Sequence, residues 1–241
     1  MQLLLIACLK EFKSHLNCKK VLFLIPRTNY ERPLTTIKGF ASTLLADDVT
    51  FSAKDQHEFL QLIAEESDRL TELVEQLMDL ARLKAGTLRV NVETLPLQAI
   101  LRMAQARLET LGANHRLIVE TPTDMLHLMA DGQRVAQVLV NLVGNAAKFA
   151  PPGTEIRVRV SCLPAKAQFD VEDQGPGIPP EKRTLVFEAF RQLEPRRGGR
   201  RGAGLGLAIS KELVEAQGGR IWIQDAEHPG TVISFTLPLA Q

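Results

Sequence analysis

Two stretches in the first part of the chain repeat apolar residues at helical spacing. The first begins at Pro33 and ends near Asp47, and its apolar positions are Leu34, Ile37, Phe40, Ala41, Leu44 and Leu45. The second follows Ser52, a favoured N-cap residue, and ends at Gly86; its apolar positions include Phe59, Leu60, Ile63, Leu70, Val74, Leu77, Leu80 and Ala81. A short loop joins the two, so the pattern predicts a helical hairpin over residues 33–86.

This hairpin carries a broad apolar stripe that needs a partner. Two copies can bury it by forming a four-helix bundle, which predicts a homodimer through residues 33–86. The alternative is that the hairpin packs on the C-terminal part of its own chain. Residues 1–32 show no sustained period and are interpreted as an irregular N-terminal segment.

After Gly86 the helical and extended patterns alternate. Residues 87–94 are interpreted as a linker and first strand, because residues 88–95 alternate, and residues 95–241 as a second domain. Helices are predicted at 97–111, 134–151 and 205–217, and strands at 116–120, 125–129, 155–161, 167–172, 220–224 and 231–237. This order predicts an α+β sandwich with helices on one face of a mostly antiparallel sheet.

Composition narrows the class of protein. The chain has 241 residues, 45% of them hydrophobic and 24% charged, which leaves room for one large domain or two small ones. A net charge of +1 gives no overall field that favours nucleic acid or membrane. The three Cys residues share no metal-ligand spacing, which fits a reducing compartment and implies no structural zinc.

The apolar opening MQLLLIACL ends after nine residues, far short of the roughly 20 that span a bilayer. We therefore expect no membrane segment in this chain and a cytoplasmic location. An inner-membrane anchor in a longer parent protein stays open.

The predicted helix over 134–151 has an unusual polar stripe opposite its apolar face. Asn141 and Asn145 lie one turn apart on this stripe, followed by Lys148. Asn is a poor helix former, and a solvated face usually carries Glu and Lys instead, although a solvated face is the alternative interpretation. An amide oxygen can coordinate Mg²⁺, and a lysine can meet a phosphate as a point charge. The stripe therefore predicts a metal and nucleotide site.

Two glycine-rich segments follow that helix. The first, DQGPG from Asp173 to Gly177, comes directly after a strand, where a carboxylate can accept a hydrogen bond from an exocyclic amine. The second, GGRRGAGLGL from Gly198 to Leu207, leads into a helix whose first backbone amides can hold phosphates. Neither segment fits the Walker or dinucleotide pattern, and each alone is a weak signal.

In this order the segments are a strong signal, and residues 131–237 resemble the catalytic ATP-binding domain of bacterial two-component sensor histidine kinases, in the GHKL superfamily. The matching motifs are NLVGNAAKF (141–149), DQGPG (173–177), FEAF (187–190), GAGLGL (202–207) and the final strand GTVISFTLPL. Residues 33–86, with PLTTIKGFASTLL, resemble the dimerisation and phosphoacceptor hairpin of the same family. The resemblance implies a GHKL-type α/β sandwich after a dimerising four-helix bundle.

The resemblance also implies ATP and Mg²⁺ as cofactors and assigns roles to the helix 134–151. Asn145 is then the metal ligand, Asn141 lines the phosphate site, and Lys148 contacts a phosphate. Asn141 and Lys148 are the implied catalytic residues. GHKL hydrolases carry Glu at the position of Asn141, where it activates water as a general base, so Asn here favours transfer to another nucleophile.

For the rest of the site, the resemblance implies that Asp173 reads the adenine amine. The other implied cofactor-binding residues are Gly175, Gly177, Gly202, Gly204, Leu205, Gly206 and Thr231. The segment between Gly177 and Gly202 is the implied lid over the nucleotide. It holds Arg196, Arg197, Arg200 and Arg201; a nucleic-acid patch is the alternative, but no aromatic residues alternate with these arginines.

The phosphoacceptor His of the family is absent. Members carry it in HELRTP, and the chain reads TNYERP from Thr28 to Pro33, so Thr28 stands at the His position. The codons CAC GAA CTA CGA ACG CC spell HELRTP and, displaced by one base, spell TNYERP. We infer that residues up to about 32 are read in a shifted frame. The nucleotide sequence before Pro33 tests this inference, because it should spell HELRT in the neighbouring frame.

These observations predict a sensor histidine kinase core that binds Mg·ATP, dimerises through 33–86 and has a response regulator receiver domain as partner, with no nucleic acid. Without the acceptor His the chain is expected to be deficient in autophosphorylation. One alternative is a non-enzymatic ATP-binding or dimerisation module that titrates an intact kinase. Another is a GHKL ATPase or serine kinase, against which Asn141 and the hairpin argue.

Overall fold

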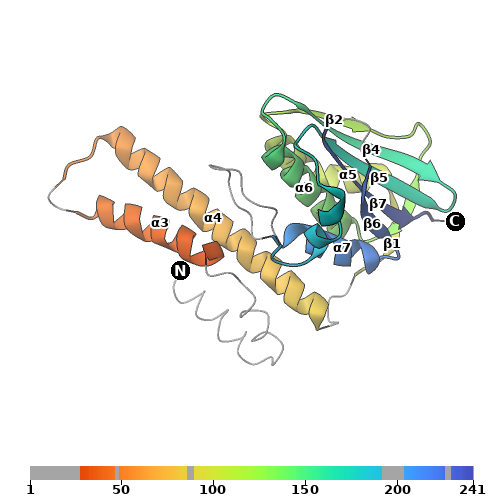
Figure 1. Ribbon diagram of the computed structural model, residues 1–241, viewed down its shortest axis with the longest axis horizontal. Coiled ribbons are helices and arrows are strands. Elements are labelled where there is room, and N and C mark those ends of the chain that lie inside the picture. The colour runs from red at the N-terminus through yellow and green to blue at the C-terminus, as the bar shows by residue number, and fades with distance from the viewer. Residues whose placement is uncertain (1–27, 47–48, 86–89, 192–203, 226–228, 241) are drawn as a thin grey trace. The chain divides into compact units, whose positions relative to one another are not determined.

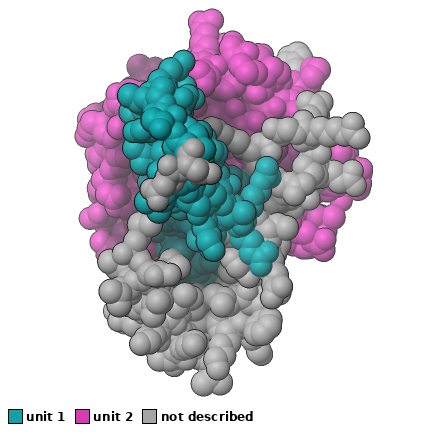
Figure 2. Space-filling view, turned by 90° about the vertical axis from the view of Figure 1, so that its left-hand side faces the viewer, with its two compact units in different colours: residues 1–88 teal, residues 89–241 magenta. Residues whose placement is uncertain are grey.

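The computed structural model describes residues 28–46, 49–85, 90–191, 204–225 and 229–240. The chain divides into two compact units, residues 1–88 and residues 89–241, coloured teal and magenta in Figure 2.

Unit 1 is the helical hairpin. Helix α3 (Thr28–Leu44) packs along helix α4 (Ala53–Lys84), as Figure 1 shows. The Ser52 hydroxyl accepts a hydrogen bond from the backbone N–H of Asp55 at 3.2 Å, which confirms the N-cap expected at the start of the second helix.

Helix α3 begins at Thr28, earlier than Pro33, where the hydrophobic pattern places its start. Residues 28–32 carry no apolar period, so backbone hydrogen bonding extends the helix where the pattern gives no sign of it. The hydroxyls of Thr35 and Thr36 donate to the carbonyls of Glu31 and Arg32 at 2.7 and 3.1 Å, which adds side-chain hydrogen bonds beside the proline.

Unit 2 holds the remaining elements, and nearly all were predicted within a few residues. The helix 97–111 and the strands 116–120 and 220–224 have the bounds expected from the sequence. The first strand is shorter than the alternation over 88–95 suggests, since Asn91 donates its backbone N–H to the side chain of Asp131 at 3.0 Å instead of joining a ladder. In chain order the elements are β1 (Glu93–Pro96), α5 (Leu97–Leu111), β2 (Arg116–Glu120), β3 (His127–Ala130), α6 (Gly132–Phe149), β4 (Glu155–Leu163), β5 (Lys166–Asp173), the short 3₁₀ turns η1 (Pro180–Lys182) and η2 (Leu185–Phe187), α7 (Gly206–Glu215), β6 (Arg220–Gln224) and β7 (Thr231–Pro238).

The main sheet has the strand order β2-β4-β5-β7-β6, and only the β2/β4 pair is parallel. The inner face of its central strands is mostly apolar and buried, with the rings of Phe169 and Phe235 stacked at 4.6 Å across β5 and β7. Helix α6 packs on β4 and β5, and α7 packs on β6 and β7. Strands β1 and β3 form a separate antiparallel pair. The α+β sandwich predicted from the sequence is confirmed.

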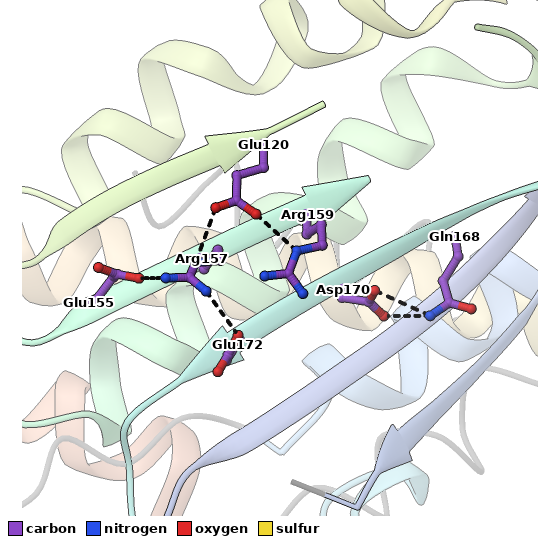
Figure 3. A network of polar contacts seen from close by, with 7 residues as sticks. All are labelled: Glu120, Glu155, Arg157, Arg159, Gln168, Asp170 and Glu172. Carbon is purple, nitrogen blue, oxygen red and sulfur yellow. Dashed lines mark hydrogen bonds and ion pairs between the residues drawn. The ribbon is translucent and has the colours of Figure 1, made fainter. Parts of the chain in front are cut away.

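The outer face of the same sheet carries polar side chains, as Figure 3 shows. Arg157 on β4 lies among the carboxylates of Glu120, Glu155 and Glu172, and Arg159 donates to Glu120 at 2.9 Å. The hydrogen bond from Arg159 holds the pKa of the Glu120 carboxyl below its usual value. Alternation along the strands therefore sends apolar residues to the helices and charged residues outward.

The turn between β4 and β5 contains a strained residue. Pro164 and Ala165 connect the paired residues Leu163 and Lys166, and Ala165 has a φ of 63°. Only Gly adopts this left-handed region without steric cost, so Ala165→Gly is expected to raise the free energy of unfolding by about 0.5 to 1 kcal/mol. Urea unfolding of both proteins measures it. Gly153→Ala is the matched control and should lower the free energy of unfolding. Gly153 has a φ of 82°, which alanine adopts only with strain, and a Cβ there would meet no other atom. An unchanged Ala165→Gly midpoint contradicts the strain argument.

Candidate functional site

Helix α6 is the element on which the site is built. The Asp131 side chain caps it by accepting the backbone N–H of Arg134 at 3.2 Å, and its apolar residues are buried against the sheet and α5. Its burial pattern leaves Asn141 and Asn145 half-buried and Lys148 exposed. The polar stripe predicted from the sequence is therefore a real, partly accessible face of this helix.

The middle of α6 meets the start of α7. The side-chain amide of Asn141 donates to the hydroxyl of Ser210 at 2.7 Å. A Cβ on Gly206 would stand 2.1 Å from Oδ1 of Asn141, so any larger residue would force this carboxamide to move. Leu205, at the N-cap position of α7, is buried and provides no side-chain cap, which leaves the first backbone amides of α7 without that kind of partner.

The C-terminal end of α6 meets the turn that follows β5. A Cβ on Gly175 would come within 3.3 Å of the Phe149 carbonyl oxygen, and the backbone N–H of Gly175 donates to Oδ1 of Asp173 at 2.7 Å. Asp173 pairs with Thr231 across β5 and β7, and each is 8% exposed. The structure therefore brings Asp173, Gly175 and Thr231 together, as the sequence analysis expects.

Two further glycines shape this end. Gly177 has a φ of 74°, and a Cβ there would lie 3.0 Å from the carbonyl oxygen of Gly230. A Cβ on Gly230 would lie 2.0 Å from the carbonyl oxygen of Asp173. The turn after Asp173 and the backbone at Gly230 are thus packed closely against each other.

Burial raises the pKa of the Asp173 carboxyl above its ordinary value. Hydrogen bonds from the backbone of Gly175 and from the backbone and side chain of Thr231 oppose the shift without cancelling it. The charged form of Asp173 is consequently costly in the empty protein, and a ligand that donates a hydrogen bond to it would relieve that cost.

The two ends of the site lie along one helix face. Asn141 and Phe149 are eight residues apart, which is about 12 Å along the axis of α6. Asn145 lies between them on the same face. The exposed ring of Phe149 has the ammonium of Lys148 at 5.0 Å from its centroid. Such a length suits an extended nucleoside triphosphate better than a compact ligand.

Residues 178–191 of the implied lid are described, whereas residues 192–203, with Gly202 and the four arginines Arg196, Arg197, Arg200 and Arg201, lie outside the described residues. The described residues on the two sides of this stretch are joined, because the backbone N–H of Phe190 donates to the carbonyl of Gly204 at 2.8 Å. Phe190 and Gly204 have φ values of 65° and 70°. Both ends of the segment therefore turn sharply at one place.

No individual role was predicted for Ser210, Gly230 or Phe190, although Phe190 is the last residue of the FEAF motif. Gly230 directly precedes Thr231 in the final strand motif, and this adjacency could have marked it. Ser210 is a polar residue at a fully buried position of a helix, and its partner Asn141 is 69 residues away in sequence. No local pattern links the two.

Comparison with known proteins agrees with this geometry. Residues 130–241 match the family described as histidine kinase-, DNA gyrase B-, and HSP90-like ATPase, and residues 32–86 match the His Kinase A (phospho-acceptor) domain. A solved structure of the mycobacterial sensor histidine kinase MprB is 32% identical, with a TM-score of 0.54 over 62% of this chain and 98% of that one. The chain therefore belongs to the two-component sensor histidine kinases of the GHKL superfamily.

Among curated relatives, the sensor protein KdpD of Clostridium acetobutylicum is 31% identical over 207 residues, which cover 86% of this chain and 23% of that protein. The chain spans between 14% and 34% of the length of the curated relatives it matches. The histidine kinase ThkA, solved in complex with the response regulator protein TrrA, shares the fold at 23% identity, with a TM-score of 0.67 over 88% of this chain and 59% of that one. No helix within the described ranges is long and apolar enough to cross a membrane.

Proposed function

We propose that unit 2 binds Mg·ATP along α6, as the cytoplasmic catalytic part of a histidine kinase. The observation that carries this proposal is that one helix, α6, contacts both glycine-rich segments. Asn141 of α6 lies against Gly206, at the segment proposed to hold phosphates, and the Phe149 carbonyl lies against Gly175, at the segment proposed to hold adenine. The Asp173 carboxylate, beside Thr231, accepts a hydrogen bond from the adenine amine. The backbone amides of Gly204, Leu205 and Gly206 hold phosphates, and Lys148 adds its charge.

The residues present fit a magnesium ion. Among the residues that the structure describes, no three His, Cys, Asp or Glu side chains gather to hold a metal. A half-buried amide on the polar stripe, Asn145, suits an ion that takes one protein oxygen and otherwise keeps phosphate oxygens and water. When bound, Mg²⁺ neutralises the charge that develops on the phosphates.

Asn141 favours phosphoryl transfer over hydrolysis. Its amide cannot take a proton from water, and it is already engaged by Ser210. The γ-phosphoryl group is therefore kept for a histidine nucleophile, which the hairpin of this chain lacks because Thr28 occupies that position. From such a histidine the group would pass to the receiver domain of a response regulator. The solved complex of ThkA with TrrA supports that type of partner for the fold.

The hairpin supports dimerisation. Leu34 on α3 and Leu60 on α4 are 44% and 56% exposed within one chain. Burying such side chains against a second copy is favourable by about 1.5 to 3 kcal/mol for each leucine that becomes fully covered. We propose a homodimer through residues 33–86, in which the two hairpins form a four-helix bundle.

The chain is expected to bind ATP but to acquire no acid-labile phosphate, because Thr28 occupies the histidine position. Calorimetric titration should show ATP binding that depends on Mg²⁺, and Asn145→Asp should change this binding. ADP serves as a second ligand in the same titration. Incubation with radiolabelled ATP should leave the wild-type chain unlabelled. The double variant Thr28→His with Asn29→Glu restores the histidine and the adjacent acidic residue of the family motif, and an acid-labile label on it alone would show that the catalytic part is intact.

Two results would contradict this proposal. Robust acid-labile labelling of the wild-type chain would mean that another residue accepts phosphate. Absence of ATP binding under any Mg²⁺ concentration would remove the nucleotide site itself.

The threonine at position 28 also favours a second candidate, a non-enzymatic module that forms mixed dimers with an intact kinase and lowers its activity. A double variant that binds ATP and dimerises but stays unlabelled would support this candidate over the kinase. Mixed dimers recovered in a pull-down with an intact kinase would support it directly.

A further inference from the structure

The hydroxyl of Ser210 lies at an unusual place for a serine. Ser210 is 1% exposed and is flanked along α7 by buried apolar residues, which would pack equally well around alanine. Serine in the interior of a helix commonly hydrogen bonds to the carbonyl four residues earlier. Here the hydroxyl instead accepts the side-chain amide of Asn141 on α6 at 2.7 Å.

This hydrogen bond connects α6 and α7 through side chains. At the other end of the helix pair, Gln217, which follows α7, accepts the backbone N–H of Asp131, the N-cap residue of α6, at 2.7 Å. The two connections fix how α7 lies along α6. Only the Ser210 connection is beside the polar stripe, since the other lies at the N-terminus of α6.

The carboxamide of Asn141 is held from two directions. Ser210 holds its nitrogen, and Gly206 lies so close to Oδ1 that no Cβ would fit between them. The carboxamide therefore fills the separation between α6 and the first turn of α7 at this point. That separation decides whether the α7 amides and Asn145 reach the same phosphate groups.

We propose that Ser210 is a positioning residue for the triphosphate part of the nucleotide. Its buried hydroxyl fixes the Asn141 carboxamide against Gly206 and thereby sets the spacing between α6 and the start of α7. The proposal rests on the nucleotide function proposed above. It adds a residue that affects the affinity for the phosphates through Asn141, without touching the nucleotide itself. Adenine recognition at Asp173, two helical turns away, is independent of Ser210.

The test compares Ser210→Ala with wild type for two ligands, Mg·ATP and adenosine, in competition with a fluorescent nucleotide. Loss of one buried hydrogen bond corresponds to about a three- to tenfold change in affinity. We expect the Kd for ATP to rise by that factor and the Kd for adenosine to stay within twofold. In an Asn141→Ala background, Ser210→Ala should change the ATP affinity by less than twofold, because the group it holds is gone.

Ser234→Ala is the matched control. Ser234 is 0% exposed in the same unit, and its hydroxyl donates to Asp170 at 2.6 Å on the outer face of the sheet. It reports the effect of losing a buried serine hydroxyl away from the site, and neither ligand should bind differently. Ser210→Cys keeps the size of the side chain with a much weaker hydrogen bond and replaces the alanine variant if that variant does not fold.

Equal weakening of ATP and adenosine by Ser210→Ala overturns the proposal, because it indicates general loosening of the unit. An undiminished effect in the Asn141→Ala background also overturns it. If the wild-type protein binds neither ligand, the nucleotide function itself is refuted. If the wild-type protein binds ATP and Ser210→Ala binds it equally well, only the role of Ser210 is refuted.

Discussion

Replacing Asp173 by Asn is expected to weaken ATP binding by about 10- to 150-fold, which corresponds to the loss of a hydrogen bond to a charged acceptor. Oδ1 of this residue is already used by the backbone N–H of Gly175. The remaining oxygen becomes an NH₂ group in the variant and faces the adenine amine as a second donor. The variant therefore replaces an attractive contact by a repulsive one.

The same variant is expected to be about as stable as wild type at pH 7.5, because the cost of the buried charge is removed while the hydrogen bonds from Thr231 are weakened. The pKa of the Asp173 carboxyl is raised in the folded protein, chiefly by burial, so its ionised form costs stability at pH values above that pKa. A neutral amide avoids the cost and can still accept from Gly175. As the pH falls through the raised pKa, wild type gains a proton and the cost disappears, so its stability should rise relative to the variant.

ATP affinity should follow the opposite pH trend. Adenine is read by the ionised carboxylate, so a proton on Asp173 must leave before ATP binds, and the wild-type Kd should rise as the pH falls through the raised pKa. Calorimetry and urea unfolding across a pH series measure both trends. Asp170→Asn, on the same strand but on the outer face, is the control and should leave ATP affinity unchanged. A pH-independent Kd in wild type would show that Asp173 is not the adenine reader.

Much of unit 2 could be predicted because its elements bury one clear face each. The strand that ends at Asp173 alternates residue by residue, and α5 has the bounds that its helical period gives. The start of α3 was missed because residues 28–32 lie in a helix without an apolar period. Periodicity reports burial, and a helical segment whose sequence has no apolar period gives no such signal.

The glycines show a different limit of the sequence. Gly204 is needed for its backbone angle, since its φ is 70°, whereas Gly206 is needed for space beside Asn141. Gly144 lies on the same helix as Asn141, yet a Cβ there would meet Leu111 at an ordinary 3.6 Å. The residue type is the same at all three positions. Only the distances to residues far away in sequence separate a steric requirement from an incidental glycine.

Replacing Gly206 by Ala is expected to weaken ATP binding by about 10- to 100-fold with little change in stability. The new Cβ would stand 2.1 Å from Oδ1 of Asn141 and 2.8 Å from its Nδ2, so the carboxamide must leave its place and the hydrogen bond to Ser210 breaks. Loss of that hydrogen bond costs about 1 kcal/mol of stability, and alanine is favoured over glycine in a helix by a similar amount. The phosphate end loses its spacing, while the fold does not lose its core.

Two variants separate this steric effect from other causes. Gly144→Ala introduces the same side chain elsewhere on α6, where there is room, and should leave ATP affinity unchanged while stabilising the helix by about 0.5 to 1 kcal/mol. In an Asn141→Ala background the space beside Gly206 is empty, so Gly206→Ala should add less than a threefold loss. If Gly206→Ala weakens ATP binding as strongly there as in wild type, the methyl group acts on the nucleotide itself. The phosphates would then approach the first turn of α7 more closely than Asn141 does.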